Sequence, residues 1–233
     1  MPVEQERAII LMFANSSSEE IKHKPIQKGK ALFEYCTMKT LREIEKSNLP
    51  YVIYTEKEQR GDSFEERLVN AIQEIFSQGY QKIITIGNDS PELKATDLVD
   101  ANRTISEKNI VIGPSMDGGI YLLGIYKTHF QKEIILQLPW KTPNLMPAMI
   151  DFFRKKQITL HIKKRLRDID TISDVKCFSG FFKTFSYSFL QLLSYLLQEE
   201  LKQFRCMTPL NYIAIIQTGR YNKGSPQLIN SFS

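Results

Sequence analysis

The sequence predicts an α/β fold in which a mostly parallel central sheet carries helices on both faces. Short, continuous apolar runs alternate along the chain with stretches of helical periodicity, which is the pattern of strands joined by crossover helices. The runs lack the polar alternation of a sheet with one wet face, so the sheet is expected to be buried on both sides. The length of 233 residues accommodates one or two such domains and a full hydrophobic core.

The expected strands are six short runs rich in β-branched and aromatic residues. They are residues 8–13 (AIILMF), 51–55 (YVIYT), 82–87 (KIITIG), 110–113 (IVIG), 120–126 (IYLLGIY) and 158–162 (ITLHI). Ligands of such sheets bind beyond the carboxyl ends of the strands, so the residues that follow each run are the candidate functional residues.

The expected helices lie between these runs. They are residues 29–47, 64–77, 96–106 and 143–156, followed by a helix that begins near residue 172. Ser63 and Glu66 fit a capping box at the start of the second helix. Thr142 is expected to cap the fourth helix, with Pro143 at its first position, where a missing N–H costs nothing.

The charge distribution divides the chain into an expected domain, residues 1–175, and an expected helical extension, residues 176–233. The formal net charge is +5, of which +4 falls in the extension. Apolar residues recur at helical spacing between Phe185 and Leu201, which predicts packing on the domain or on a second subunit as a homodimer. That pattern is more typical of a core or dimer interface than of a specific nucleic-acid site. The last polar stretch, residues 219–233, is expected to fray.

Cysteine usage and hydropathy favour a cytoplasmic protein. Cys36, Cys177 and Cys206 are too widely spaced for a metal-ligand motif and are odd in number, so no disulfide framework is expected. The aromatic-rich stretch 178–197 is interrupted by Lys183 and several polar residues, which argues against a membrane span. The first ten residues show no pattern of a signal peptide.

Two polar clusters follow the central strands. The first is residues 87–91 (GNDSP), in which Asp89 could bind a hard divalent cation or could simply cap the next turn. The second is residues 113–119 (GPSMDGG), whose adjacent glycines allow close approach of a ligand to the backbone. Asp117 could accept hydrogen bonds from sugar hydroxyls or take a proton, although Asp-Gly is also a common turn signal.

A third polar cluster is residues 165–171 (RLRDIDT). Asp168 and Asp170 alternate along an extended segment and should therefore point the same way. They could complete a metal site begun by Asp89, and Arg167 could neutralise a phosphate. The alternative is an ion pair between Arg167 and Asp168, with Thr171 capping the helix that follows.

Together, these clusters resemble one family. The segments GNDSP, GPSMDGG with IYLLGI, LPWKTP (138–143) and LRDIDTISDV (166–175) occur in the order and spacing of the radical-SAM/selenodomain-associated transferases. The resemblance covers about residues 8–175. It implies a three-layer, Rossmann-like glycosyltransferase-A fold, the fold of nucleotide-diphospho-sugar transferases. The final Asp-x-Asp-Thr segment is also similar to cytidylyl- and guanylyltransferases of cofactor biosynthesis.

The resemblance implies a role for each matching position. Asp89 and Asp170 would hold Mg²⁺ or Mn²⁺, and Asp117 would act as the general base or orient the acceptor. The positions expected to bind the nucleotide donor are Phe13, Ala14, Lys22, Lys24, Glu66, Arg67, Gly87 and Asn88. The positions expected to bind the substrate are Pro91, Gly118, Gly119, Trp140 and Arg167.

The segment after the first strand departs from the family pattern. The family has a lysine and a glycine-containing loop there, which would supply cations to the nucleotide phosphates. This chain reads FANSSSEEIKHKPI, with Asn15 at the lysine position, no glycine, and two added acidic residues. Lys22 and Lys24 keep part of the basic character.

Three functions remain open from the sequence. The leading hypothesis is a metal-dependent glycosyltransferase that moves a sugar from a nucleotide-diphosphate donor to an acceptor. The second is a nucleotidyltransferase, which the missing glycine-rich loop disfavours. The third is an inactive relative that only binds its ligand.

Overall fold

The computed structural model describes residues 7–180 and 185–207, with the side chains of 203–207 excepted. Six strands form one sheet: β1 (Ala8–Phe13), β2 (Tyr51–Tyr54), β3 (Lys82–Ile86), β4 (Asn109–Pro114), β5 (Ile120–Tyr126) and β6 (Thr159–Ile162). Their order is β2-β1-β3-β5-β4-β6, and only β5 runs antiparallel to its neighbours. The expected mostly parallel sheet and all six expected strands are confirmed.

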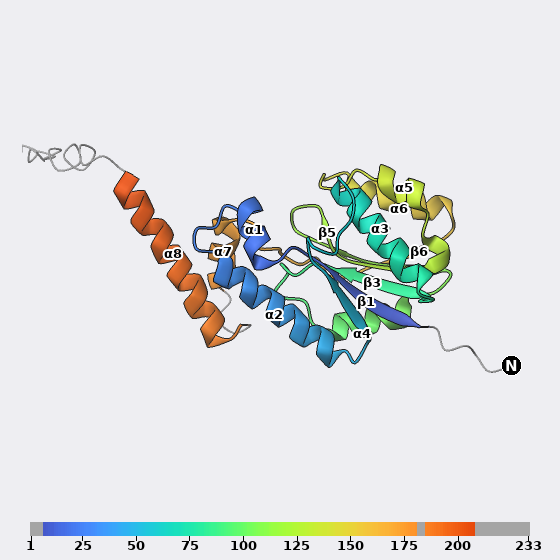
Figure 1. Ribbon diagram of the computed structural model, residues 1–233, viewed down its shortest axis with the longest axis horizontal. Coiled ribbons are helices and arrows are strands. Elements are labelled where there is room, and N and C mark those ends of the chain that lie inside the picture. The colour runs from blue at the N-terminus through green and yellow to red at the C-terminus, as the bar shows by residue number, and fades with distance from the viewer. Residues whose placement is uncertain (1–6, 181–184, 208–233) are drawn as a thin grey trace, which may run out of the picture.

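Helices cover both faces of this sheet, as expected (Figure 1). They are α1 (Ser17–His23), α2 (Lys30–Lys46), α3 (Phe64–Ser77), α4 (Ala95–Thr104), α5 (Lys132–Gln137), α6 (Leu145–Lys155), α7 (Ile172–Ser179) and α8 (Tyr187–Met207), with a 3-10 turn, η1, at Lys127–His129. The sequence did not predict α1, α5 or η1, which are short. None of the described helices is long and apolar enough to span a bilayer.

Alternation along β1 explains the two cores. Ile9 and Leu11 pack with α3, α5 and α6 on one face of the sheet, whereas Ile10 and Met12 pack with α2 and α4 on the other. The side chains on both faces are almost fully buried. The expectation of a sheet buried on both sides is therefore confirmed.

The helix caps are confirmed at two sites and wrong at one. Ser63 and Glu66 form the expected capping box of α3, and the backbone and hydroxyl of Thr171 donate to Asp174 at the start of α7. However, α6 begins at Leu145 with Asn144 as its cap, so Thr142 does not cap it. The Thr142 hydroxyl instead donates to the carbonyl of Pro139 over 2.8 Å, which closes a turn before the helix.

A third core cluster joins α8 to the rest of the chain. Phe189 and Leu193 of α8 are buried against α2 and α7, and the Phe189 ring stacks on Tyr35 at a centroid distance of 4.5 Å. Val175 lies inside α7, and the division of the chain at residue 175 stays a prediction. The end of the expected extension, residues 208–233, lies outside the described residues, as does the side chain of Cys206. A homodimer and a cytoplasmic location also stay predictions.

Candidate active site

Two adjoining cavities open at the carboxyl ends of β1 and β3. One has a volume of about 700 Å³ and the other about 330 Å³. Both are lined by Phe13, Phe64, Gly87, Asp89 and Lys141, so they meet at these residues. The larger cavity extends toward α1 and the start of α3, and the smaller one extends toward the β4–β5 turn. This is the sheet edge at which the sequence placed the candidate functional residues.

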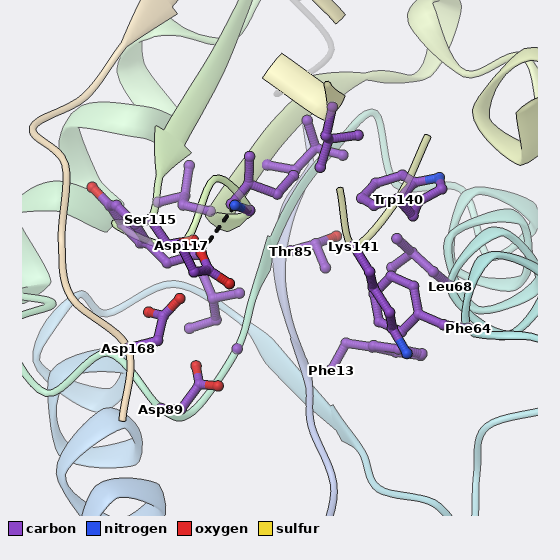
Figure 2. A pocket seen from close by; sticks show the side chains of 18 of the residues that line it. Phe13, Phe64, Leu68, Thr85, Asp89, Ser115, Asp117, Trp140, Lys141 and Asp168 are labelled. Atoms are coloured by element: carbon purple, nitrogen blue, oxygen red, sulfur yellow. Dashed lines mark hydrogen bonds between the residues drawn. The ribbon is translucent and has the colours of Figure 1, made fainter. Parts of the chain in front are cut away.

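Four carboxylates line the smaller cavity: Asp89, Asp117, Asp168 and Asp170. Figure 2 shows the first three on one side of it. The four come from three loops that are distant in sequence. The segment after β6 runs alongside β4, where the Met116 N–H donates to the carbonyl of Leu166 over 2.9 Å. It then crosses to the loop after β3. Asp168 and Asp170 thus face the same cavity, as their alternation predicted.

Asp168 is a partly buried carboxyl group on this side of the cavity. Burial raises the pKa of Asp168, and the negative charges of Asp89 and Asp117 raise it further. The Ser90 hydroxyl donates a hydrogen bond to Asp168 and opposes this rise by stabilising the charged form. Burial likewise raises the pKa of Asp170, against the stabilising charge of Lys24.

Asp117 lies in the tight turn between β4 and β5. Its Oδ1 accepts hydrogen bonds from the backbone N–H of Gly119, over 2.9 Å, and from the hydroxyl of Ser115, which is buried. Gly118 has a φ of +96°, a conformation that glycine adopts readily. The segment therefore forms a turn, as one of the two interpretations expected, and this turn places Asp117 and Gly119 in the lining of the smaller cavity. Their role in binding or catalysis stays a prediction.

The opposite wall of the smaller cavity is apolar (Figure 2). Phe64 packs edge-on against Phe13 and Trp140. Trp140 is 7% exposed, and its indole N–H donates to the carbonyl of Ile135 over 2.7 Å, so it is anchored in the core while lining the cavity. Thr85 also lines this cavity, and its buried hydroxyl has no hydrogen-bond partner among the described residues. A ligand with a polar group could pair with that hydroxyl.

Lys24 lies between the two carboxylates expected to hold a metal. Its Nζ is 2.8 Å from Asp89 Oδ2 and 2.9 Å from Asp170 Oδ1, and it also contacts Glu20 Oε1 at 2.8 Å. The carbonyl of Ile169 is a fourth acceptor at 3.1 Å. Burial favours the neutral amine, but the charges of Asp89, Glu20 and Asp170 outweigh it and raise the pKa of Lys24 above its ordinary value.

The carboxylates do not fit a divalent metal while Lys24 holds this position. Mg²⁺ requires oxygens at about 2.0–2.1 Å in octahedral geometry, whereas the separations around Lys24 Nζ are those of ammonium–carboxylate hydrogen bonds. Among the described residues, no group of three or more His, Cys, Asp or Glu side chains is arranged to hold a metal ion.

Besides Lys24, two cations line the larger cavity. Arg67 lines this cavity, and its buried Nε has no hydrogen-bond partner among the described residues. Lys141 lies 5.0 Å above the centroid of the Phe64 ring and makes no ion pair within the described part of the chain. The predicted donor-binding residues Ala14 and Asn88 also line this cavity. The Asn88 amide donates to Thr37 Oγ1 over 2.8 Å.

Five predicted site residues line neither cavity. Lys22 is exposed and pairs with Glu19, and Glu66 closes the capping box of α3. Gly118 faces Pro143, and Pro91 is buried within the loop after β3. Arg167 pairs with Asp174 at 3.3 Å, so the alternative pairing with Asp168 is wrong.

Several cavity residues were not among the predicted ones. Asp168 was considered with Asp170 for a metal site, because their alternation was visible in the sequence, but the family resemblance assigned it no role. Lys141 had a weaker signal, as the neighbour of Trp140 in a proline-bounded loop. Thr85 and Phe64 carried no signal, since a threonine in a strand and a phenylalanine at a helix start are ordinary structural residues.

Comparison with solved structures identifies the fold. A presumed nucleotide-diphospho-sugar transferase from Desulfovibrio desulfuricans G20 superimposes with a TM-score of 0.68 at 19% sequence identity, covering 82% of this chain and 97% of that one. A cytidylyltransferase from Leptospira borgpetersenii is more distant, with a TM-score of 0.42 at 13% identity, covering 84% of this chain and 96% of that one. The first likeness confirms the expected nucleotide-diphospho-sugar transferase fold.

A family model matches part of the sequence. No curated protein matches the chain. Residues 40–142, which include α3, β3 and the two motifs around Asp89 and Asp117, match the family described as "Uncharacterized protein conserved in bacteria (DUF2064)".

Proposed function

We propose that the chain is an enzyme that binds a nucleotide-diphospho-sugar and transfers its sugar to an acceptor. The observation that carries the proposal is the meeting of two cavities of unequal size at Asp89, on the sheet edge where this fold class binds ligands. The larger cavity has room for a nucleotide. The smaller has room for a sugar, and its apolar wall faces a wall of hydrogen-bond acceptors.

Charge favours placing the diphosphate where the cavities join. Arg67 and Lys141 both line the larger cavity, and Lys141 also lines the smaller one. The Nε of Arg67 has no hydrogen-bond partner among the described residues. Phosphate oxygens between these two cations would complete their hydrogen bonds. As the bond to the sugar breaks, negative charge grows on the departing diphosphate, and both cations would stabilise it.

The acceptor would lie in the smaller cavity beside Asp117. This carboxylate is fixed by Ser115 and Gly119 and can receive a proton from an acceptor hydroxyl. The Gly119 backbone allows the acceptor to approach closely. Holding the nucleotide in the larger cavity brings the donor's sugar next to the acceptor in the smaller one, which supplies the proximity that the reaction requires. No step here passes through a metal ion, because Lys24 holds the carboxylates that would bind it.

Isothermal titration calorimetry with UDP-, GDP- and CDP-sugars tests this proposal. We expect one of them to bind with one-to-one stoichiometry, and we expect Arg67→Met to weaken that binding. Absence of binding by every donor would contradict the proposal. Release of pyrophosphate from a nucleoside triphosphate would instead identify a nucleotidyltransferase, the alternative reaction that this fold supports.

A further inference from the structure

The ammonium of Lys24 has no donor left for a ligand. It carries three N–H groups, and four oxygens surround it: one each from Glu20, Asp89 and Asp170, and the carbonyl of Ile169. The side chain is 12% exposed, although the residue borders the larger cavity. Lys24 therefore cannot bind a phosphate in this arrangement without giving up one of its carboxylates.

The segment that carries Lys24 is built to hold it in place. Glu56 accepts hydrogen bonds from the backbone N–H and hydroxyl of Ser16, the N-cap of α1, over 2.7 and 2.8 Å. Lys24 ends this helix, and its ammonium also lies 5.5 Å from the centroid of the Phe33 ring. One of the two added acidic residues after β1 therefore has a structural role: Glu20 points inward to Lys24 and is only 7% exposed.

The positions of the carboxylate oxygens suit an ammonium group and not a divalent metal ion. The three carboxylates come from α1, from the loop after β3 and from the segment after β6, yet they converge on one point. Their distances of 2.8–2.9 Å match an ammonium and exceed by nearly 1 Å those that Mg²⁺ requires. Repulsion from the fixed ammonium would also oppose a second cation at the same carboxylates.

We propose that Lys24 replaces the divalent metal of this site, so that Asp89 and Asp170 bind a metal ion only when Lys24 is removed. One consequence, that nucleotide-sugar binding needs no metal ion, rests on the proposed function. Lys24 would then be a positioning residue, which fixes Asp89 at the junction of the cavities and Asp170 on the wall of the smaller one. The cations that meet the phosphates would be Arg67 and Lys141.

Binding of Mn²⁺ alone tests the metal part of the proposal without any nucleotide. The amplitude of the electron paramagnetic resonance signal of free Mn²⁺ reports binding to the wild type, to Lys24→Met and to Lys30→Met. Lys30 is an exposed lysine at the start of α2 and serves as the matched control. We expect Lys24→Met to bind Mn²⁺ at least about tenfold more tightly than the other two proteins. Adding Asp89→Asn to it should abolish the gain.

Two results would overturn the proposal. One is tight binding of Mn²⁺ to the wild type that Asp89→Asn removes, and the other is an affinity of Lys24→Met equal to that of the Lys30→Met control. If Lys24→Met does not fold, as judged by circular dichroism, the double variant Glu20→Gln/Lys24→Met removes one charge of each sign and is expected to gain the same Mn²⁺ site. The titration of the wild type with Mn²⁺ tests whether it binds the metal tightly, whether or not Lys24→Met folds.

A second titration tests the consequence for the donor. The nucleotide-sugar that binds best is titrated into the wild type in EDTA and again in Mn²⁺, and we expect affinities that agree within about twofold. If the nucleotide-sugar bound only in the presence of Mn²⁺, the proposal that Lys24 replaces the metal would be overturned. If no nucleotide-sugar binds in either buffer, the proposed function fails, whereas the Mn²⁺ experiment still decides whether Lys24 holds the metal position.

Discussion

The backbone N–H of Ile169 donates a hydrogen bond to the carbonyl of Asp89 over 3.0 Å. This bond joins the segment after β6 to the loop after β3, which are distant in sequence. Because Ile169 is fully buried, the two aspartates that flank it, Asp168 and Asp170, are held at the cavity wall. The acidic wall of the site is thus a consequence of backbone pairing.

Replacing Arg67 should weaken nucleotide binding without unfolding the protein. Arg67→Met removes a charged donor that faces the larger cavity, and a hydrogen bond to a charged group contributes about 1.5–3 kcal/mol. We therefore expect a loss of affinity of about tenfold or more in calorimetry. Stability should change little, because the Nε of Arg67 has no partner to lose among the described residues. Arg154→Met, on the exposed end of α6, is the control, and an equal loss there would contradict the assignment.

Gly113 should not tolerate a side chain. A Cβ at this position would lie 2.4 Å from the ring of Tyr121, a cavity residue whose hydroxyl donates to the carbonyl of Lys164. Gly113→Ala should therefore lower the free energy of unfolding by ~1–3 kcal/mol through overpacking. Gly180→Ala is the matched control, since its nearest atom would be 3.5 Å away. Urea denaturation that gave the same midpoint for Gly113→Ala and the wild type would refute this packing.

Truncating Phe189 should destabilise the protein if α8 is an integral part of it. The side chain is fully buried between α2 and α7, so Phe189→Ala is expected to cost ~3–5 kcal/mol. Tyr187→Ala, at an exposed site on the same helix, should stay within about 0.5 kcal/mol of the wild type. If thermal unfolding does not separate these two variants, α8 does not pack on the chain as described.

The stability of the protein should depend on pH through Cys36. Burial, together with the charge of Asp89, raises the pKa of this thiol to about 12. The unfolded thiol loses its proton near pH 8.5, so above that pH the folded state binds more protons and stability falls as the pH rises. Between pH 9 and 12, we expect Cys36 to contribute a loss of about 1 kcal/mol per pH unit.

Comparison with Cys36→Ala isolates this effect from other groups that titrate. The variant is less stable at pH 7 because it leaves a cavity, but its free energy of unfolding should fall less steeply above pH 9 than that of the wild type. Parallel curves in guanidinium titrations would show that the buried thiol does not titrate as stated.

The sequence predicted the sheet and its helices well because apolar periodicity and caps are local signals. The runs at 8–13 and 82–87 are typical of buried strands, and the Ser63–Glu66 pair indicated the start of α3. The start of α6 was missed by two residues, because the Thr142 hydroxyl closes a local turn with Pro139 and no longer acts as a cap. Turn and cap chemistry compete at such residues, and the sequence does not reveal which prevails.

The site was predicted less completely, because it depends on contacts between distant segments. Asp89, Asp117 and Asp170 were recognisable as carboxylates after strands, and they do meet in one cavity. However, Lys24 was expected to serve a phosphate. Its position between Asp89 and Asp170 follows from a helix, α1, that the sequence did not predict. Arg167 was drawn away from the cavity by Asp174, a partner only seven residues away.

A crystal structure with the nucleotide-sugar that binds best would test the central claim most directly. We predict that the nucleoside occupies the larger cavity, that the diphosphate lies within hydrogen-bond distance of Arg67 or Lys141, and that the sugar enters the smaller cavity beside Asp117. A nucleotide bound outside these two cavities, or with its phosphates remote from both cations, would contradict the proposed function.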